Sequence, residues 1–438
     1  MHRTLQSAVA LMPGPLSDVR VVEACGPIGH YAGRLLADLG ADVIKVEPPA
    51  GDPARRYAPF LPGVEAPEDG LQFILLNANK RGVVLDLERA QERAVFLRLV
   101  ASADVLLDSW EPHESARIDL TEEVLLAARP DLIRTSVTGW GLSGPYADWA
   151  YADIVAQAMS GVMTLAGFPD GPPEQIADHQ GHRTASINAT AGTVAALLHR
   201  DATGDGQRVE VSAQEALSMA QETAMMFADI NGTNRERTGG TGGLAVRIPG
   251  VGLYQTNDGW VYTLAAGTAG SGFQGVLATM DVLGYACDLR DEPWAGFIAE
   301  SMNRSLLLQA MADPAEAAVL AAKLEHIGAT VEDFFRHHSK RELYEVGQAQ
   351  RLLIGMVSAP PDISASPQLN ARHWFVEIDD PGRGRLLRYP GPPWQLHGTP
   401  ATLRRPAPLL GEHTAEVLAE IGVGAGEASA PTPHGSPR

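Results

Sequence analysis

The sequence predicts an α/β protein: a parallel sheet covered by helices on both faces, followed by a second domain of mixed character. Three observations support this prediction. From Val19 to Trp140, apolar β-branched runs alternate with amphipathic helical runs, and strands separated by single helices imply right-handed βαβ crossovers. A hairpin signal at Asn257-Asp258-Gly259 then breaks the pattern. The chain of 438 residues is also too long for one ordinary core.

The first elements are predicted from residue type and period. They are the strand VRVVEA (19–24), the helix YAGRLLADLG (31–40), which Gly40 closes in the C′ position, and the strand ADVIKVE (41–47). The same alternation predicts a strand at 82–87, a helix at 88–103, a strand at 104–109, a helix at 121–130 and a strand at 132–140.

The middle and end of the chain are more helical and then return to strands. The hairpin signal lies in LYQTNDGWVYTLAA (253–266), and helical segments follow it up to about Glu345. Beyond them, strands and Pro/Gly turns reappear at 373–396. Before the hairpin, the pattern predicts helical segments at 151–167 and 176–200, a strand at 207–213 and one helix at 214–228.

The composition argues against several function classes. Acidic residues number 53 against 34 basic ones, a formal net charge of −19, which repels nucleic acid and anionic membranes. No run of about 18 uncharged apolar residues suggests a membrane span. Only Cys25 and Cys287 are present, so neither a disulfide framework nor a CxxC metal site is available. We expect a cytoplasmic protein that binds neither nucleic acid nor membranes.

Three familiar kinds of site find little support. The first strand-to-helix junction, EACGPIGHYAG, precedes an acid, Glu47, but its glycine spacing departs from GxGxxG, so dinucleotide binding is a minor alternative. His179 and His182 lie three residues apart with no third ligand nearby in sequence, which is weak for zinc. The GxSxG motif of serine hydrolases is absent. We therefore expect no metal site.

Several motifs, in order, resemble those of the class III coenzyme A transferases of the CaiB/BaiF type. They include YAGRLLADLGADVIKVEPPAGDPAR, LNANKRGVVLDL, PDLIRTSVTGWGLSGPYAD, AALLHRDATGDGQRVEVS and RRPAPLLGEHTAEVLAEIG. Relatives in this family are formyl-CoA transferase, carnitine CoA-transferase and the α-methylacyl-CoA racemases. The likeness runs from about Val19 to Gly422.

The resemblance implies a Rossmann-like large domain built from both ends of the chain, a smaller α+β domain inserted between them, and two interlocked subunits in a homodimer. The expected divisions are a leader at 1–18, the large CoA-binding domain at 19–227, the small domain at 228–345, a return segment at 346–422 and a disordered tail at 423–438.

The resemblance also implies that CoA or acyl-CoA binds over the carboxyl edge of the sheet, with a carboxylic acid as the second substrate. A tryptophan there can stack on or enclose the ligand, and an arginine can hold a phosphate oxygen. Core packing of the tryptophan and a solvated arginine remain the alternatives. Carried over position by position, the pocket residues are Gly26, Pro27, Ile28, Leu85, Ser109, Trp110 and Arg117.

The family's transferases use an aspartate as nucleophile at the start of a helix. An ungapped count back from AALLHRDATGDGQ places His182 at that position, whereas Asp178, in a matching IAD, aligns only if four residues are inserted. The racemases require a histidine just before Asp153, and this chain has Ala152, so racemization is disfavoured.

Three hypotheses remain for the segment 176–200. Asp178 is the nucleophile of a CoA-transferase; or His182 is a base or nucleophile in other acyl-CoA chemistry, such as hydrolysis, elimination or acyl transfer; or the protein binds acyl-CoA without catalysis. Each residue also has a purely structural alternative. Asp178 would cap the helix, and His182 would be a packed, hydrogen-bonded residue.

Overall fold

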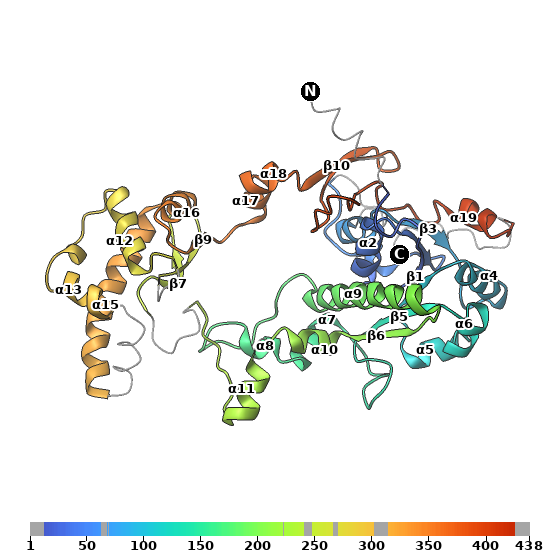
Figure 1. The fold of residues 1–438 in the computed structure, drawn as a ribbon, viewed down its shortest axis with the longest axis horizontal. Helices are drawn as coiled ribbons and strands as arrows, with labels where there is room; N and C mark the ends of the chain where they lie inside the picture. Colours follow the sequence, from blue (N-terminus) through green and yellow to red (C-terminus); the bar gives the residue numbers. More distant parts are fainter. Residues whose placement is uncertain are drawn as a thin grey trace, which may run out of the picture. The chain divides into compact units, whose positions relative to one another are not determined.

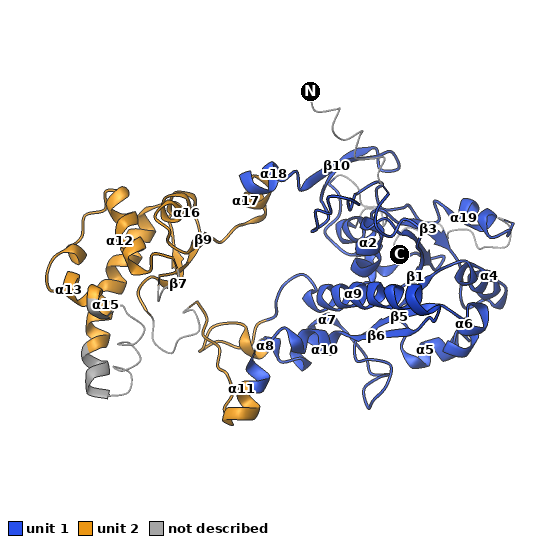
Figure 2. Ribbon diagram, viewed as in Figure 1, with its two compact units in different colours: residues 1–163, 175–226, 367–438 blue, residues 164–174, 227–366 orange. Residues whose placement is uncertain are grey.

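The computed structural model describes residues 13–62, 68, 70–221, 223–240, 248–265, 270–301 and 314–424. The chain folds into two compact units, coloured separately in Figure 2. Most of the predicted leader and tail lies outside the described residues. Unit 1 is built from Met1–Met163, Gln175–Met226 and Pro367–Arg438, and unit 2 from Thr164–Glu174 and Phe227–Ser366.

Unit 1 contains a sheet of six strands in the order β3-β2-β1-β4-β5-β6. Every neighbouring pair is parallel, as the alternation of strands and helices predicted. Successive strands add on one side of β1 and then, from β4 onward, on the other, so the strand order reverses between β1 and β4. The strands are β1 (Arg20–Ala24), β2 (Asp42–Glu47), β3 (Arg81–Val84), β4 (Val105–Asp108), β5 (Ile133–Thr138) and β6 (Arg208–Ser212).

Helices cover both faces of this sheet (Figure 1). Consecutive strand residues point to opposite faces, so Val21 joins the core under α2 and α9, while Val22 joins the core under α4, α6 and α19. Small residues of α9, among them Ala185 and Ala189, let that helix pack closely on the sheet. The bounds are α2 (His30–Asp38), η1 (Pro53–Arg56), α3 (Leu71–Asn77), α4 (Ala90–Ala101), α5 (Pro112–Arg117), α6 (Glu122–Ala128), α7 (Asp153–Met159), α9 (Gln180–Thr203), α10 (Ala213–Met219), α18 (Pro367–Ala371) and α19 (Thr414–Glu420).

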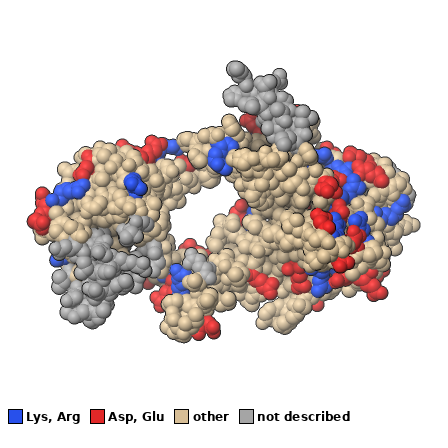
Figure 3. Space-filling model, in the orientation of Figure 1, with Lys and Arg blue, Asp and Glu red and all other residues tan. Residues whose placement is uncertain are grey.

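The C-terminal segment belongs to unit 1. Its antiparallel pair β10 (Phe375–Asp380) and β11 (Arg385–Pro390) matches the strands predicted at 373–396. Arg81 at the start of β3 forms ion pairs with Glu416 and Glu420 of α19, at 2.8 and 2.6 Å. Figure 3 shows acidic and basic side chains intermingled over the visible face of unit 1.

Unit 2 combines a small antiparallel sheet with helices. The predicted hairpin is confirmed, because β7 (Val251–Gln255) pairs with β8 (Trp260–Leu264) on either side of Asn257-Asp258-Gly259. A third strand, β9 (Ile354–Met356), pairs with β8. The helices are α8 (Val162–Leu165, its first two residues in unit 1), α11 (Ala224–Asn231, its first three residues in unit 1), α12 (Phe273–Val282), η2 (Asp288–Arg290), α13 (Trp294–Ser301), α15 (Pro314–His337), α16 (Lys340–Ala349) and α17 (Pro360–Ser364).

Two helical predictions need correction. The single helix predicted at 214–228 is wrong, because the structure has two helices there, α10 and α11. The segment 151–167 is likewise interrupted, at Gly161, which has a φ of +88°. A Cβ at Gly161 would also lie 2.8 Å from the Gln221 side chain. Apolar period alone did not reveal either break. In the described part of the chain, no helix has both the length and the apolar character needed to span a bilayer.

Candidate active site

The loops after β1 and β4 meet where the strand order reverses, the position at which open α/β sheets usually bind ligands. The first loop carries Gly26, Pro27 and Ile28, and the second carries Ser109 and Trp110. The Gly26 amide donates a hydrogen bond to the Ser109 hydroxyl at 2.9 Å. A Cβ at Gly26 would meet only that hydroxyl, 3.8 Å away. The geometry therefore leaves the first loop open to close approach by a ligand.

The other predicted pocket residues lie in different environments. Leu85 is fully buried, and its amide donates to the Glu47 carbonyl, so its side chain belongs to the core. Trp110 is half-buried and packs edge-to-face on Phe96, with ring centroids 5.9 Å apart. Arg117 is an exposed residue at the end of α5 that forms an ion pair with Glu88. The structure thus brings Gly26 and Ser109 together and leaves the ligand roles of the other three as predictions.

A buried polar network lies beneath the first loop. The Lys45 Nζ atom is 3.0 Å from Asp52 Oδ2 and 3.3 Å from Glu23 Oε1, and it donates to the Cys25 carbonyl of the loop at 3.1 Å. Burial lowers the pKa of Lys45, but Asp52 and Glu23 outweigh burial and raise it above its ordinary value. Lys45 is therefore a buried cation that holds the first loop from below.

Two further residues lie against Glu23 in this network. Lys80 lies 2.6 Å from Glu23 Oε2, an ion pair without a well-aligned hydrogen bond. Burial is the largest effect on Lys80 and lowers its pKa to about 8, against the opposing effect of Glu23. A Cβ at Gly33 would come within 1.8 Å of Glu23 Oε2, so only glycine fits beside this carboxylate.

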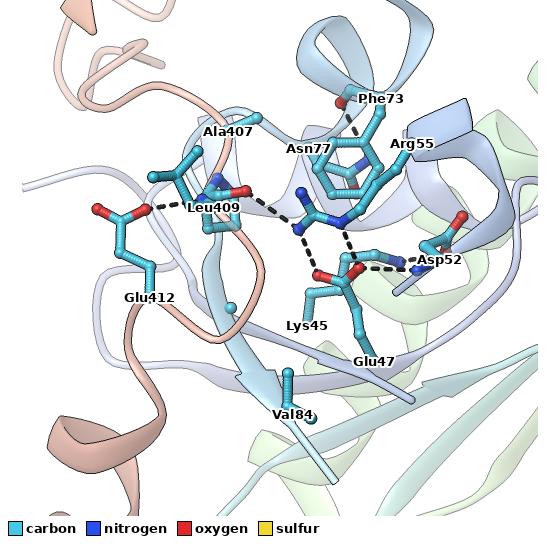
Figure 4. Close-up of polar contacts among 12 residues, drawn as sticks. Lys45, Glu47, Asp52, Arg55, Phe73, Asn77, Val84, Ala407, Leu409 and Glu412 are labelled. Atoms are coloured by element: carbon cyan, nitrogen blue, oxygen red, sulfur yellow. Dashed lines mark hydrogen bonds and ion pairs between the residues drawn. The ribbon is translucent and has the colours of Figure 1, made fainter. Parts of the chain in front are cut away.

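The acid that ends β2 is fully engaged by an arginine, as Figure 4 shows. Both oxygens of Glu47 accept hydrogen bonds from Arg55, each at 2.7 Å. The Arg55 guanidinium lies 3.9 Å from the centroid of the Phe73 ring and donates to the Pro408 carbonyl of the C-terminal segment at 3.1 Å. Glu47 therefore has a structural role, which removes the acid on which dinucleotide binding depended.

The start of α9 is capped from another helix. Asp178 and His179 both have left-handed backbones, with φ of 67° and 52°, and no side chain of the N-cap residue His179 caps the helix. The His182 amide instead donates to Asp153 Oδ1 of α7 at 2.9 Å. The alternative that Asp178 is the helix cap is therefore wrong, because Asp153 supplies that acceptor.

A glutamine fixes the capping carboxylate in place. Gln157 donates to Asp153 Oδ2 at 2.7 Å, and it exchanges two hydrogen bonds with the backbone of Ile176, at 2.9 and 3.0 Å. Asp153 and Gln157 are both buried. This pair anchors the segment that carries Asp178 onto α7.

His182 is half-buried between two aromatic rings. Its ring stacks on that of His179, with centroids 5.3 Å apart and an interplanar angle of 10°, and it also packs against Tyr151. Burial lowers the pKa of His182 to about 4, with Asp153 opposing the shift. Its Nδ1 atom is buried without a hydrogen-bond partner in the described residues. His182 is therefore packed as a neutral imidazole. The structural alternative expected a packed and hydrogen-bonded residue, and the Nδ1 atom lacks such a bond.

Asp178 is accessible, in contrast to Asp153. Its side chain is 70% exposed, and its Oδ2 atom lies 3.6 Å from the guanidinium of Arg183. One turn further along α9, the Ser186 hydroxyl donates to the Ile28 carbonyl at 2.7 Å. The early turns of α9 are therefore fixed against the first loop, so both predicted halves of the site lie in the same part of unit 1.

Asp153, His179 and His182 form the one cluster in the described chain whose residue types could hold a metal ion. Their ligand atoms all lie within 4.8 Å of one another, and two histidines with one carboxylate are a common zinc set. Asp153 already accepts two hydrogen bonds. The sequence suggested the two histidines but missed Asp153, because the third ligand type comes from a different helix.

Sequence reasoning noted Arg183 without giving it a role, and it missed Tyr31 and the buried Lys45. Arg183 directly follows His182, and Tyr31 comes three residues after Ile28, so their positions beside predicted site residues were a usable signal. No comparable pattern marked Lys45, which appeared as one charge inside an apolar strand.

Comparison with known proteins gives one consistent result. The family model described as CoA-transferase family III matches residues 16–414. The chain is 34% identical to the subunit BbsE of succinyl-CoA:(R)-benzylsuccinate CoA-transferase from Thauera aromatica, covering 93% of this chain and 94% of that protein. It is 31% identical to succinate–glutarate CoA-transferase from Agrobacterium fabrum, covering 93% and 96%. A CAIB/BAIF family protein from Brucella suis superposes with a TM-score of 0.78 at 28% identity, covering 93% and 100%.

Proposed function

The chain belongs to CoA-transferase family III, and we propose on that premise that it moves CoA from an acyl-CoA thioester to a carboxylic acid through an acyl group carried on Asp178. The observation that supports Asp178 is its accessibility. Asp178 is 70% exposed beside Arg183, whereas Asp153 is buried with both oxygens hydrogen-bonded. A carboxylate nucleophile needs a free oxygen, and Asp178 offers one.

The reaction is balanced without a net proton. The Asp178 carboxylate attacks the thioester carbonyl and the C–S bond breaks, so that the CoA thiolate departs. The acyl group is then joined to Asp178 as a mixed anhydride. The thiolate then attacks the Asp178 carbonyl and releases the donor acid. The same steps in reverse, with the acceptor acid, form the new thioester and restore the carboxylate.

The CoA would lie at the strand-order reversal. Gly26 and Ser109 supply a hydrogen-bonded floor, and Pro27 and Ile28 continue the first loop. Trp110 at its edge would enclose the ligand, and Arg117, which ends α5, would exchange Glu88 for a phosphate oxygen. No metal takes part in this proposal.

Trapping the acyl group tests the proposal. Incubation with succinyl-CoA followed by hydroxylamine should convert the Asp178 side chain to a hydroxamate, detected by mass spectrometry of the peptide that spans residues 176–183. The Asp178→Asn variant should give no such product. A modification on another residue, or turnover without any trapped acyl group, would rule out Asp178.

A second candidate function is a noncatalytic acyl-CoA-binding subunit. It is favoured by the ungapped position of His182 and by the relative from Thauera aromatica, which is named as a subunit. Calorimetry separates the two candidates. Tight binding of succinyl-CoA, with neither exchange nor trapped acyl group across a panel of acceptor acids, would favour the binding subunit.

We also propose an interlocked homodimer in the cytoplasm. Large apolar side chains of unit 1 are exposed in the single chain, among them Met219 at 79% and Leu198 at 67%, and a second subunit would cover such a surface. The cytoplasmic location rests on Cys25 and Cys287, which are both free thiols. A stable folded monomer at micromolar concentration in sedimentation would contradict the dimer.

A further inference from the structure

Among the described residues, Arg183 in the first turn of α9 differs from other largely buried arginines, because it has no hydrogen-bonded carboxylate partner. The Arg183 side chain is only 15% exposed. Among the described residues, its guanidinium has one ionic neighbour, Asp178 at 3.6 Å, and donates no hydrogen bond. By contrast, Arg34 donates to Asp38 at 2.7 Å, and Arg200, on the same helix, donates to Asp104 at 3.0 Å.

Unused guanidinium donors in a largely dehydrated position are costly unless an acceptor fills them. Guanidinium presents its donors as a planar fork that matches a carboxylate. The environment of Arg183 therefore suits an anionic group that the described residues do not supply.

A second donor lies beside this fork. The Arg183 guanidinium carbon is 5.5 Å from the centroid of the Tyr31 ring, and Tyr31 belongs to the first turn of α2. Burial raises the pKa of Tyr31, with Arg183 opposing the shift, so the phenol stays protonated at neutral pH. Its hydroxyl has no hydrogen-bond partner among the residues that the structure describes, and it can donate to the same anion.

We propose that Arg183, assisted by the Tyr31 hydroxyl, binds the remote carboxylate of a dicarboxylic acyl group such as succinyl. This inference rests on the proposed function, because it places the reacting carbonyl at Asp178. The two carboxyl carbons of a four-carbon diacid lie roughly 4 Å apart. That span is comparable with the 3.6 Å between Asp178 and Arg183, so one end of the acyl group can react while the other end is held.

The acyl groups of the relatives agree with this chemistry. The two curated relatives described above act, by their names, on succinyl-CoA and benzylsuccinate and on succinate and glutarate. Each of these acids has a second carboxylate. Monocarboxylic acyl groups would leave Arg183 without a partner, and the site would discriminate against them.

Binding measurements with a matched pair of thioesters test the proposal. Succinyl-CoA and butyryl-CoA have the same chain length and differ in the remote carboxylate. Arg183→Gln should weaken the binding of succinyl-CoA roughly 10- to 100-fold, which is the effect of losing a charged hydrogen-bonded pair. It should change the affinity for butyryl-CoA by less than about threefold. Arg183→Lys should retain part of the preference, because it keeps the charge and loses the fork.

Two further variants complete the design. Tyr31→Phe removes one hydroxyl, so it should weaken the binding of succinyl-CoA by roughly 3- to 10-fold and leave the binding of butyryl-CoA unchanged. It also keeps the test valid if Arg183→Gln fails to fold. Arg200→Gln, at the far end of α9, should leave the succinyl-to-butyryl ratio unchanged.

The proposal fails if Arg183→Gln leaves the affinities for both thioesters unchanged. It also fails if the substitution weakens the binding of both thioesters equally, because Arg183 would then contact the CoA moiety or the reacting carbonyl instead. This readout is independent of turnover. If the wild type discriminates between the thioesters but shows no trapped acyl group, the proposed function fails while the role of Arg183 stands.

Discussion

The two halves of the candidate site differ in how their polar groups are satisfied. At the strand-order reversal, the loops rest on buried charges that face one another, with Lys45 between Asp52 and Glu23 and the Gly26 amide on Ser109. At the start of α9, the backbone is left-handed at Asp178, the Nδ1 atom of His182 is unpaired in the described structure, and Asp178 is exposed. The paired charges at the strand-order reversal therefore fix the conformation of the loops. The start of α9, in contrast, leaves the Asp178 carboxylate accessible for reaction.

This difference indicates where substitutions should affect folding and where they should affect chemistry. Changes beneath the first loop remove partners from buried charges, so they should cost stability. Changes at the start of α9 remove groups that the protein does not need for folding, so they should cost activity. The following predictions test this division, beginning with the largest effect.

Asp178→Ala should lower the rate of CoA exchange by about 10⁴-fold or more, because a nucleophile removed from covalent catalysis has no substitute. Stability should change little, since the side chain is 70% exposed. Exchange between succinyl-CoA and a labelled acid measures the rate. Asp201→Ala, an exposed aspartate at the other end of α9, is the matched control and should keep wild-type activity. Retained exchange in Asp178→Ala would move the reaction elsewhere.

Lys45→Met should destabilise the protein by about 3–5 kcal/mol, because it removes the buried cation that two carboxylates share and leaves Glu23 with Lys80 alone. Urea unfolding measures the loss from the shift in midpoint. The control is Lys323→Met in unit 2, where an exposed lysine lies over the Phe297 ring; it should cost less than about 1 kcal/mol. Equal effects of the two substitutions would show that the buried network contributes no more than a surface charge.

His182 should make the protein less stable in mild acid. Its folded pKa of about 4 lies below the ordinary value of 6.5, so the unfolded chain binds more protons between these values and stability falls as pH drops from about 6.5 to about 4. His182→Gln should reduce this loss, relative to the wild type, by on the order of 1–2 kcal/mol after allowance for its partial exposure. Unfolding at about pH 7 and about pH 5 measures the difference.

The exposed His199, near the other end of α9, provides the comparison for that experiment. His199→Gln should leave the pH dependence of stability as it is in the wild type. If His182→Gln unfolds with an unchanged pH dependence, His182 is not held neutral by the fold.

Ser109→Ala should have the smallest effect. It removes the acceptor for the Gly26 amide, and we expect CoA binding to weaken by about 3- to 10-fold, equivalent to about 1 kcal/mol. Calorimetry with CoA measures the change. Ser102→Ala, which removes a hydroxyl bonded to the Leu99 carbonyl at the end of α4, should leave CoA affinity unaltered. An unchanged affinity in Ser109→Ala would place the ligand away from this pair of loops.

The sequence by itself determined the architecture of the sheet. Apolar β-branched runs alternating with amphipathic helical runs predicted β1 to β5 as strands of a parallel sheet and β6 as a further strand. Gly40 ended α2 with a φ of +111°, which an ordinary side chain would not adopt readily. The Asn257-Asp258-Gly259 turn likewise predicted β7 and β8. These features depend on residues close in the chain, so local patterns carry them.

Only the tertiary structure decided which polar groups are paired. Asp153 on α7 caps α9 in place of Asp178, and Arg55 takes both oxygens of Glu47. Among the residues that the structure describes, Arg183 next to Tyr31 has no hydrogen-bond acceptor. Whether a carboxylate is free or engaged depends on which helices pack together, because its partners come from distant segments. The residues available for chemistry therefore became apparent only when α2, α7 and α9 were seen in contact with the sheet and with one another.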